Sequence, residues 1–534
     1  MAISDISRRA FLAGLAVTGV AAACGGDDNG SPNATNADVA LPEIDGDPFS
    51  LGIASGDPID TAVILWTRLA PDPSRSDGGM PGEPVPVEWE VAGDDGFATI
   101  VASGRVVTGP EVAHSVHVDA NGLEPDTTHW YRFTVGDRTS EIGRTRTMPS
   151  AGDVPDAFTI AQVSCQRWDQ GEYAAYRDIA EDEIDLVVHC GDYVYERPVA
   201  PDEAVRPAIA EPAITLEDYR ALYGLYKGDP HLQAAHAVAP WVITWDDHEV
   251  SNNYVGETPS ADSESATADE LLARRAAGYQ AWWEHMPARL DPPDGPDLDI
   301  YRRIEVGDLA RIHVLDTRQY RTVLDCDSAS SVGPRCATST DPGTTVLGDD
   351  QEMWLTAGLS QGSPVWDVVA QQIVLHQWRF GAGDGDEIVW NLDQWDGYPA
   401  ARSRLLDTLG GSAGQPVVLT GDVHTSWVSE LRADFDEPGS ARVGTEFVVP
   451  GVSSTPSDLL AAAAPQVRSF SDHIRYDEEA HTGWLRHQLT SDAWTATYRY
   501  VEDAADSASA VTDGPTFLLT PTGDLSRGQP TRTD

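Results

Sequence analysis

The sequence has few basic residues. Over 534 residues it contains 35 Lys and Arg against 86 Asp and Glu, which gives a formal net charge of −51. Nucleic acids are held largely by Lys and Arg, so we expect no nucleic-acid-binding domain. The same charge would repel an anionic substrate, so binding any such substrate would require a local positive centre, which bound metal ions can supply. As an alternative, the acidity serves only to keep the protein soluble.

The apolar stretch at residues 11–23 is shorter than the roughly 20 residues that a membrane-spanning helix needs. Residues 7–12 before it resemble a twin-arginine export signal. Residues 21–24 resemble a lipoprotein cleavage site with Cys24 as the lipidated residue, and ordinary cleavage after an A-x-A sequence is the alternative. We therefore expect an exported protein, at the cell surface, outside the cell or in the periplasm. Its expected partners are the twin-arginine export machinery and, through a lipid anchor at Cys24, the membrane.

Cysteine is scarce, with five residues. Cys326 and Cys336 lie in the long loop 324–347, and two such cysteines in an exported protein predict a disulfide. Cys190 lies inside an apolar strand pattern and is interpreted as a core residue.

Residues 45–150 contain short segments of alternating or clustered β-forming residues between turn signals. The segment 122–127, just before Trp130 and Tyr131, resembles the corner of a fibronectin-type sandwich. This pattern predicts a small all-β domain of immunoglobulin or fibronectin type.

After residue 155, apolar strands alternate with helical patterns, which predicts a buried sheet in an α/β layer fold. Thr267 and Glu270 have the spacing of a capping box at the start of one helix. The expected helices are 173–181, 216–238 and 268–286. The expected strands are 158–164, 184–190, 241–245, 310–315, 365–375 and 416–420.

Polar residues that suit metal binding follow four of these strands. They are Cys165, Asp192, Tyr195, Asp247, His248, Asn252, Asp422 and His424. Ligands of α/β sheets bind beyond the carboxyl ends of the strands, so we expect these side chains to converge. Carboxylate and amide oxygens suit Ca²⁺, Mg²⁺ or Mn²⁺, whereas thiolate, phenolate and imidazole together suit a metal such as Fe³⁺. The mixture predicts a centre with both kinds of ion, bridged by Asp192.

The residues around these positions resemble a known superfamily. Residues 191–195 match the G-D-x-x-Y motif of calcineurin-like metallophosphoesterases, residues 247–249 resemble their N-H-E motif with Asp for Asn, and residues 421–424 their G-H-x-H motif with Asp for the first His. Cys165 stands where those enzymes carry Asp. These replacements, with the N-terminal β domain, resemble the PhoD-like alkaline phosphatase family over residues 45–515.

The resemblance implies an α/β fold of the four-layer metallophosphoesterase type, a β-sandwich flanked by helices and preceded by the small all-β domain. The expected division of the chain is a signal at 1–24, a flexible tether at 25–44, the β domain at 45–150, the catalytic domain at 155–515 and a polar tail at 516–534.

The resemblance also implies metals and roles. The residues implied for one Fe³⁺ are Cys165, Asp192, Tyr195 and His424. Those implied for two Ca²⁺ are Asp192, Asp422, and Asn252 or Asp247. His248 takes the place of a proton donor to the leaving group. Arg167 is close enough to Cys165 in sequence to reach a phosphate oxygen, with a surface ion pair as the alternative.

Other polar and aromatic residues near the motifs have simpler interpretations. Asn253 is expected to build a turn and His376 to pack in the core. Trp395 and Tyr398 are interpreted as packing residues, with a place in the pocket wall as the alternative, and Arg318 and Arg321 are interpreted as structural.

The function implied is that of a secreted, monomeric phosphoesterase that hydrolyses phosphate mono- and/or diesters by attack of a metal-activated hydroxide. One alternative is a phospholipase D-like phosphodiesterase. Another is a non-enzymatic surface protein that binds calcium, which would have no need of Cys165, Tyr195 and His424 together.

Overall fold

A computed structural model of the chain describes residues 39–326, 331–380, 388–437, 439–456 and 458–528. The expected signal at 1–24, with Cys24, and the first part of the tether lie outside the described residues. Within the described ranges, every helix is too short or too polar to span a membrane.

The first large sheet contains three of the four strands expected to carry the site, β9 (Phe158–Val163), β10 (Leu186–Cys190) and β11 (Pro240–Thr244). Its order is β24 (Leu525–Arg527), β23 (Val511–Leu519), β22 (Trp494–Val501), β21 (Gly483–Leu489), β9, β10, β11, β1 (Ile53–Ile59), β2 (Ala62–Arg68) and β5 (Ser115–Asn121). Strands β9, β10 and β11 are parallel, and every residue in them is buried. Such uniform burial is typical of parallel strands covered on both faces, which explains their continuous apolar sequences.

The second large sheet has the order β12 (Arg302–Val306), β13 (Ala310–Val314), β15 (Trp366–Ala370), β17 (Gln415–Thr420), β19 (Arg442–Val448), β18 (Ser426–Arg432) and β20 (Ile474–Glu478). Strands β13, β15, β17 and β19 are parallel. A separate ladder joins β14 (Val332–Gly333) to β16 (Trp390–Asn391).

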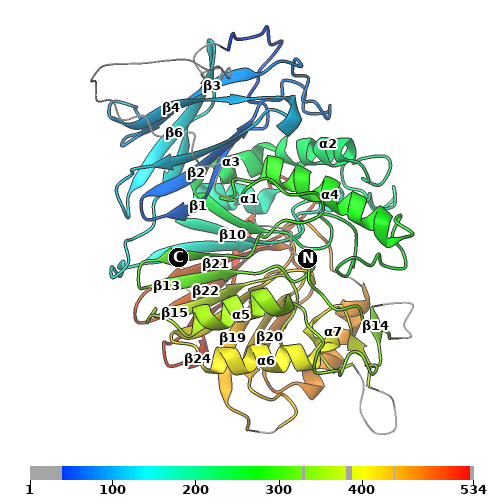
Figure 1. The fold of residues 1–534 in the computed structure, drawn as a ribbon. Coiled ribbons are helices and arrows are strands. Elements are labelled where there is room, and N and C mark those ends of the chain that lie inside the picture. The colour runs from blue at the N-terminus through cyan, green and yellow to red at the C-terminus, as the bar shows by residue number, and fades with distance from the viewer. Residues whose placement is uncertain (1–38, 327–330, 381–387, 438, 457, 529–534) are drawn as a thin grey trace, which may run out of the picture. The chain divides into compact units, whose positions relative to one another are not determined.

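The two large sheets pack face to face, with helices outside both. Ile160 and Val188 of the first sheet share a buried cluster with Ile312 and Val417 of the second. Helices α1 (Ala174–Glu181), α2 (Leu216–Lys227), α3 (Pro230–Val238) and α4 (Ala268–His285) pack on the first sheet. Helices α5 (Gly348–Leu359) and α6 (Pro399–Gly410) pack on the second, and α7 (Asp458–Phe470) precedes β20. The predicted four-layer α/β fold is confirmed (Figure 1).

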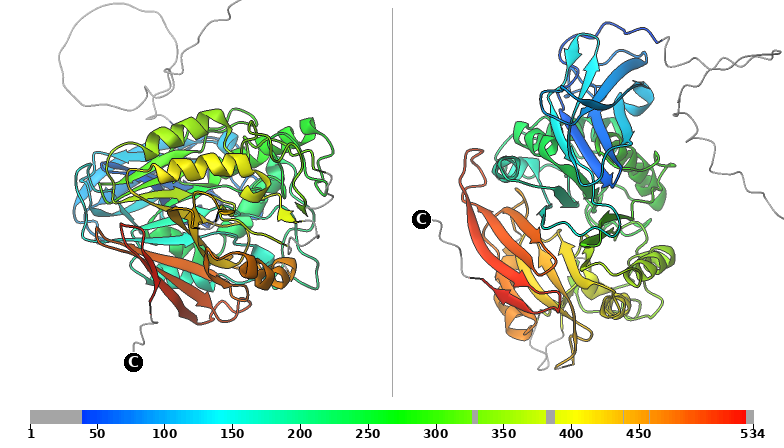
Figure 2. Two further views of the ribbon diagram at one scale, coloured as in Figure 1. Left: turned by 90° about the horizontal axis from the view of Figure 1, so that it is seen from below. Right: turned by 90° about the vertical axis from the view of Figure 1, so that its left-hand side faces the viewer.

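The N-terminal strands form a sandwich that shares a sheet with the rest of the molecule. One layer is β4 (Ile100–Thr108), β3 (Val85–Ala92), β6 (Thr128–Val135) and β7 (Arg138–Thr139), with β8 (Gly143–Arg146) paired to β6. The other layer is β1, β2 and β5, and a common core lies between the two. Strand β1 also pairs in parallel with β11, so the blue N-terminal strands continue into the main sheet (Figure 2). The predicted boundary between residues 150 and 155 stays a prediction.

Several local predictions are confirmed and others are wrong. The capping box of Thr267 and Glu270 is present, and Cys326 and Cys336 form a disulfide. The helix expected at 216–238 is two helices, because Gly228 and Pro230 end one and begin the next. The strand expected at 365–375 ends at Ala370. Within the polar tail expected at 516–534, residues 516–527 belong to β23 and β24 or to the turn between them.

Candidate metal centre

The same turn follows three strands that lead into the site. Cys165, Asp192 and Asp422 each lie two residues beyond the end of β9, β10 and β17. Their φ angles are 56°, 58° and 66°, in the left-handed region that non-glycine residues rarely adopt. Such backbone persists only where the surrounding structure holds it, and it is concentrated at functional sites. Because these turns lie at one end of the sheets, the three side chains converge.

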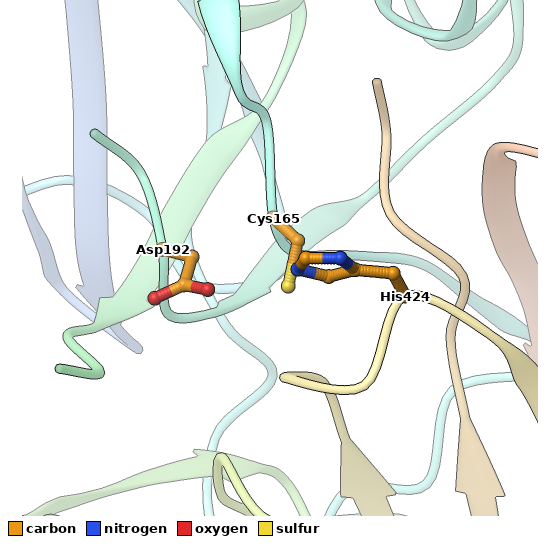
Figure 3. A group of neighbouring side chains, drawn as sticks. All are labelled: Cys165, Asp192 and His424. Atoms are coloured by element: carbon orange, nitrogen blue, oxygen red, sulfur yellow. The ribbon is translucent and has the colours of Figure 1, made fainter. Parts of the chain in front are cut away.

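Cys165, Asp192 and His424 form the first cluster (Figure 3). Their ligand atoms lie within 4.8 Å of one another. The hydroxyl of Tyr195 joins them, 2.9 Å from Asp192 Oδ2 and 3.0 Å from His424 Nε2. His424 Nδ1 lies 2.9 Å from the carbonyl oxygen of Thr455, which can only accept, so Nδ1 carries the proton. The lone pair of Nε2 therefore faces the cluster, as metal coordination requires.

Two further clusters adjoin the first through shared residues. Asp192, Asp247 and His248 make one, and Asp246, Asp247 and Asp422 make the other. Asp247 belongs to both of these clusters, and Asp192 links the Asp247–His248 cluster to the one that contains Cys165 and His424. The side chains predicted to share several ions are thus brought together in a continuous group.

The buried carboxylates fit metal ions better than they fit an ion-free interior. Among the described residues, Asp192 Oδ1, Asp246 Oδ2 and Asp247 Oδ1 are buried without a hydrogen-bond partner. Burial and the neighbouring charges of Asp247 and Asp246 raise the pKa of Asp192, and burial raises that of Asp422 to about 6. Unsatisfied, mutually repelling carboxylates are costly, and bound cations would satisfy and ionise them.

Burial, followed by the charge of Asp192, also raises the pKa of the Cys165 thiol. A buried thiol of this kind is protonated on its own, whereas a metal ligand must be deprotonated. Cys190, by contrast, lies within β10 and is a buried residue of the core between the sheets, as predicted. The two cysteines therefore differ in whether they face the carboxylates or the apolar core.

Arg318 is the main protein cation in this region. Its fully buried guanidinium contacts Asp246, lies 2.9 Å from Asp393 and 3.2 Å from Asp422. Arg321 adds a second contact to Asp393 at 2.7 Å. Arg318, interpreted from the sequence as structural, thus pairs with acids of the site itself.

His248 is paired with a carboxylate that sequence reasoning missed. Its Nδ1 lies 2.6 Å from Glu196 Oε2, and its ring centroid lies 4.2 Å from that of Tyr195, with the two planes tilted by 35°. Burial lowers the pKa of His248, but Glu196 and Asp247 outweigh it and hold the pKa above its usual value. Glu196 directly follows the G-D-x-x-Y motif, so its position next to the motif was the available signal.

The remaining predicted residues lie near the clusters in different ways. Arg167 donates to Asp169 at 3.0 Å and to the Arg197 carbonyl at 2.7 Å, and its guanidinium lies 4.6 Å from the centroid of the Tyr195 ring. The Asn252 amide donates to Asp262 at 3.3 Å, and Asn252 lines the same pocket as Asp192, Asp247 and Asp422. The Arg167 guanidinium thus packs against the ring of Tyr195 and stabilises its position.

Asn253, expected only to build a turn, lies closer to the acids than Asn252 does. Its backbone N–H donates to Asp247, and its amide lies between Asp247, Asp393 and Ser331. His376 is buried with Nδ1 2.7 Å from Glu446 and Nε2 2.7 Å from Trp378 Nε1, which agrees with its interpretation as a packing residue.

Glu249 and Gln394 were also missed. Glu249 accepts hydrogen bonds from the backbone of Asp246 at 2.8 Å and Tyr193 at 2.6 Å, so it holds two metal-site loops together. Gln394 donates to Asp422 at 2.6 Å. Glu249 lies within the N-H-E-like segment and Gln394 beside Asp393, so both could have been found by extending the motifs.

The clusters open into a pocket of about 170 Å³. Its lining includes Asp192, Asp247, His248, Asp422 and His424. Arg167 is not among the described residues that line it. The pocket is therefore lined by acids, by His248, and by Asp192 and His424 of the first cluster, while Cys165 and Tyr195 are not among the described residues that line it.

Comparison with known proteins places this site in context. Residues 158–498 match the family model described as PhoD-like phosphatase, and residues 35–149 match that of the PhoD-like phosphatase N-terminal domain. The chain is 41% identical over 490 residues to alkaline phosphatase D of Bacillus subtilis (strain 168), covering 90% of this chain and 82% of that protein. A solved structure described as the structure of PhoD matches with a TM-score of 0.86 and 40% identity, over 92% of this chain and 94% of that one.

Proposed function

The chain belongs to the PhoD-like phosphatase family and is a phosphatase, and from this premise we propose that it hydrolyses phosphate monoesters and diesters with a mixed iron and calcium centre. One observation carries the proposal. A thiol, a phenol, an imidazole and several unpartnered buried carboxylate oxygens form one continuous group, and some of these side chains line a small pocket. An acidic protein that binds calcium alone would have no use for this combination.

The donor atoms divide between two kinds of ion. Cys165, Asp192, Tyr195 and His424 would hold one Fe³⁺, since thiolate, phenolate and imidazole suit it. The residues that would hold two Ca²⁺ are Asp192, Asp247, Asp422, and Asn252 or Asn253. When bound, such ions neutralise charge on phosphoryl oxygens and lower the pKa of water, so that a nucleophile is available near neutral pH.

The residues of the chain position the reaction. His248, paired with Glu196, lines the pocket and in its protonated form would donate its Nε2 proton to the departing oxygen. Arg318 holds Asp422 and Asp393 in place from behind the site. The backbone turns at Cys165, Asp192 and Asp422 keep their side chains within the ligand clusters before substrate arrives.

We also propose that the protein is exported by the twin-arginine machinery and acts as a monomer at the cell surface or beyond, attached through a lipid at Cys24. The sequence of residues 7–24 supports this. Export of an already folded chain suits a centre whose ions are loaded before secretion.

Hydrolysis of p-nitrophenyl phosphate and bis(p-nitrophenyl) phosphate by the metal-loaded protein tests the proposal. Asp192→Asn should reduce kcat/KM for both esters by about a thousandfold or more, because it removes the ligand shared by the clusters. Asp513→Asn, which changes a half-exposed acid on β23, is the matched control and should retain full activity. Calcium binding without hydrolysis of either ester would overturn the proposal in favour of a calcium-binding surface protein.

A further inference from the structure

A second cavity adjoins the catalytic pocket. Its volume is about 690 Å³, against about 170 Å³ for the pocket that holds the metal ligands. Asn252, Asn253 and Asp393 line both spaces, so the two are neighbours across a shared rim. We call this second cavity the side chamber.

The sizes of the two spaces suggest different occupants. Pockets for organic ligands usually have volumes of about 300–1,000 Å³. The catalytic pocket is smaller than this range and has room for a phosphoryl group, whereas the side chamber lies within the range. The organic part of a bound ester therefore has space in the side chamber.

The walls of the side chamber are partly apolar. Val255, Pro259, Val323, Leu324 and Leu392 contribute to them. Val323 is 47% exposed, which is high for a valine. An apolar group that enters the chamber would shield these side chains from water, and this contributes favourably to its binding.

The charges around the side chamber disfavour an anion. No Lys, Arg or His is among the described residues that line it, and Asp262 and Asp393 are. Arginines near these two acids are already engaged in ion pairs with them: Arg197 lies 3.1 Å from Asp262, and Arg318 lies 2.9 Å from Asp393. An anionic group in the chamber would thus meet carboxylates without a free cation nearby.

The position of His248 distinguishes the two arms of a diester. His248 lines the catalytic pocket but is not among the described residues that line the side chamber. The arm that leaves receives its proton from His248 and so lies on that side. We propose that the side chamber binds the other arm, the one retained on phosphorus, and selects an uncharged and partly apolar group. This inference rests on the proposed phosphodiesterase function.

The test uses diesters that differ only in the retained arm. Methyl, cyclohexyl and 4-carboxybutyl p-nitrophenyl phosphate share one leaving group and have alkyl arms of similar electronic effect. The metal-loaded wild-type protein should prefer the cyclohexyl ester over the methyl ester by about tenfold in kcat/KM, from the added apolar burial. The carboxybutyl ester should be hydrolysed no better than the methyl ester.

Val323→Asp places a charge in the chamber at an exposed position, where folding tolerates it. It should bring the cyclohexyl-to-methyl ratio close to one and leave kcat/KM for the monoester p-nitrophenyl phosphate unchanged. Val101→Asp makes the same change at a similarly exposed valine, 44%, on β4, and should keep the wild-type ratio.

The outcomes separate the inference from the function on which it rests. If the wild-type protein hydrolyses none of these esters, the proposed function fails. If it hydrolyses them with a ratio near one, or Val323→Asp leaves a tenfold ratio intact, the side chamber does not bind the arm. If Val323→Asp lowers kcat/KM equally for the monoester and the cyclohexyl diester, the side chamber binds the leaving group instead. If the wild-type protein hydrolyses the monoester but none of the diesters, the side chamber has no retained arm to bind. Either result overturns the inference.

Discussion

Arg318 provides the sharpest test of how the acid cluster is held. Its buried guanidinium contacts Asp246, Asp393 and Asp422. Replacing it in Arg318→Met removes the shared cation and leaves three acids in a site with little water. Breaking one buried ion pair by removing a partner costs about 3–5 kcal/mol. We expect the free energy of unfolding to fall by at least this much at pH 8 with a chelator present, a large fraction of the roughly 5–15 kcal/mol typical of domains.

The loss of stability in Arg318→Met should depend on pH, and the direction of this dependence follows from the pKa of Asp422. Burial raises the pKa of this acid to about 6 from the ordinary 3.8, although Arg318 acts to lower it. Without Arg318 the pKa of Asp422 rises further. Between 3.8 and the raised pKa the folded chain keeps a proton that the unfolded chain has released, so stability falls as the pH rises through this window. The deficit of Arg318→Met should therefore be smaller at pH 5 than at pH 8.

Urea unfolding followed by tryptophan fluorescence, with chelator at both pH values, measures this. Arg475→Met is the matched control, because its partner Glu430 lies 2.6 Å away but the arginine is 44% exposed, and it should cost less than about 1 kcal/mol. If Arg318→Met does not fold, Arg318→Lys keeps the charge without the planar fork and should show an intermediate deficit. A deficit below about 1 kcal/mol at pH 8, or one that does not shrink at pH 5, refutes the reasoning.

Three further predictions concern two histidines. His248→Ala should lower kcat about a hundredfold for phenyl phosphate and less for p-nitrophenyl phosphate, whose better leaving group needs a proton less; equal losses on both esters would contradict a proton-donor role. Glu196→Gln should move the alkaline limb of the rate profile to lower pH, because Glu196 raises the pKa of His248. His487, buried between Gln162 and Trp494, has its pKa lowered by burial to about 3 from 6.5. Below pH 6.5 His487 gains its proton in the unfolded chain but not in the folded chain, so the free energy of unfolding falls as the pH falls. In urea unfolding, His487→Gln should therefore reduce the decrease in this free energy between pH 7.5 and 4.5 by about 2–3 kcal/mol. A decrease equal to that of the wild-type protein would contradict this.

The layered architecture was predictable because strands buried on both faces have continuous apolar sequences. Strands β9, β10 and β11 are buried on both faces, so their residues are apolar without alternation. Helix α4 was placed to within one residue because Thr267 and Glu270 mark its start. The parallel pairing of β11 with β1 was not predictable, because the pairing of strands far apart in sequence depends on tertiary packing.

For the site, the sequence pattern predicted the convergence of Cys165, Asp192 and His424, which a repeated strand-then-polar arrangement signals directly. The pattern did not predict which polar residues support them. Arg318 reaches the acids from the loop after β13, and Glu196 reaches His248 from the loop after β10. Such contacts depend on side-chain direction across loops, on which spacing in the sequence carries little information.

The preference for Asn252 over Asn253 shows the same limit. The two residues are adjacent, yet Asn253 has a left-handed φ of 53° and places its amide beside Asp247 and Asp393. Asn tolerates this conformation because its short polar side chain bonds locally. The sequence cannot tell which of two neighbouring asparagines adopts the turn.

The most direct test of the account is the metal content and visible absorption of the purified protein, compared with those of Tyr195→Phe. The account predicts one iron and two calcium ions per chain, and a visible charge-transfer band from the phenolate of Tyr195 that disappears in the variant while tryptophan fluorescence and unfolding cooperativity are retained. A wild-type protein that holds calcium without iron, or a band of the same intensity in Tyr195→Phe, would contradict the centre proposed here.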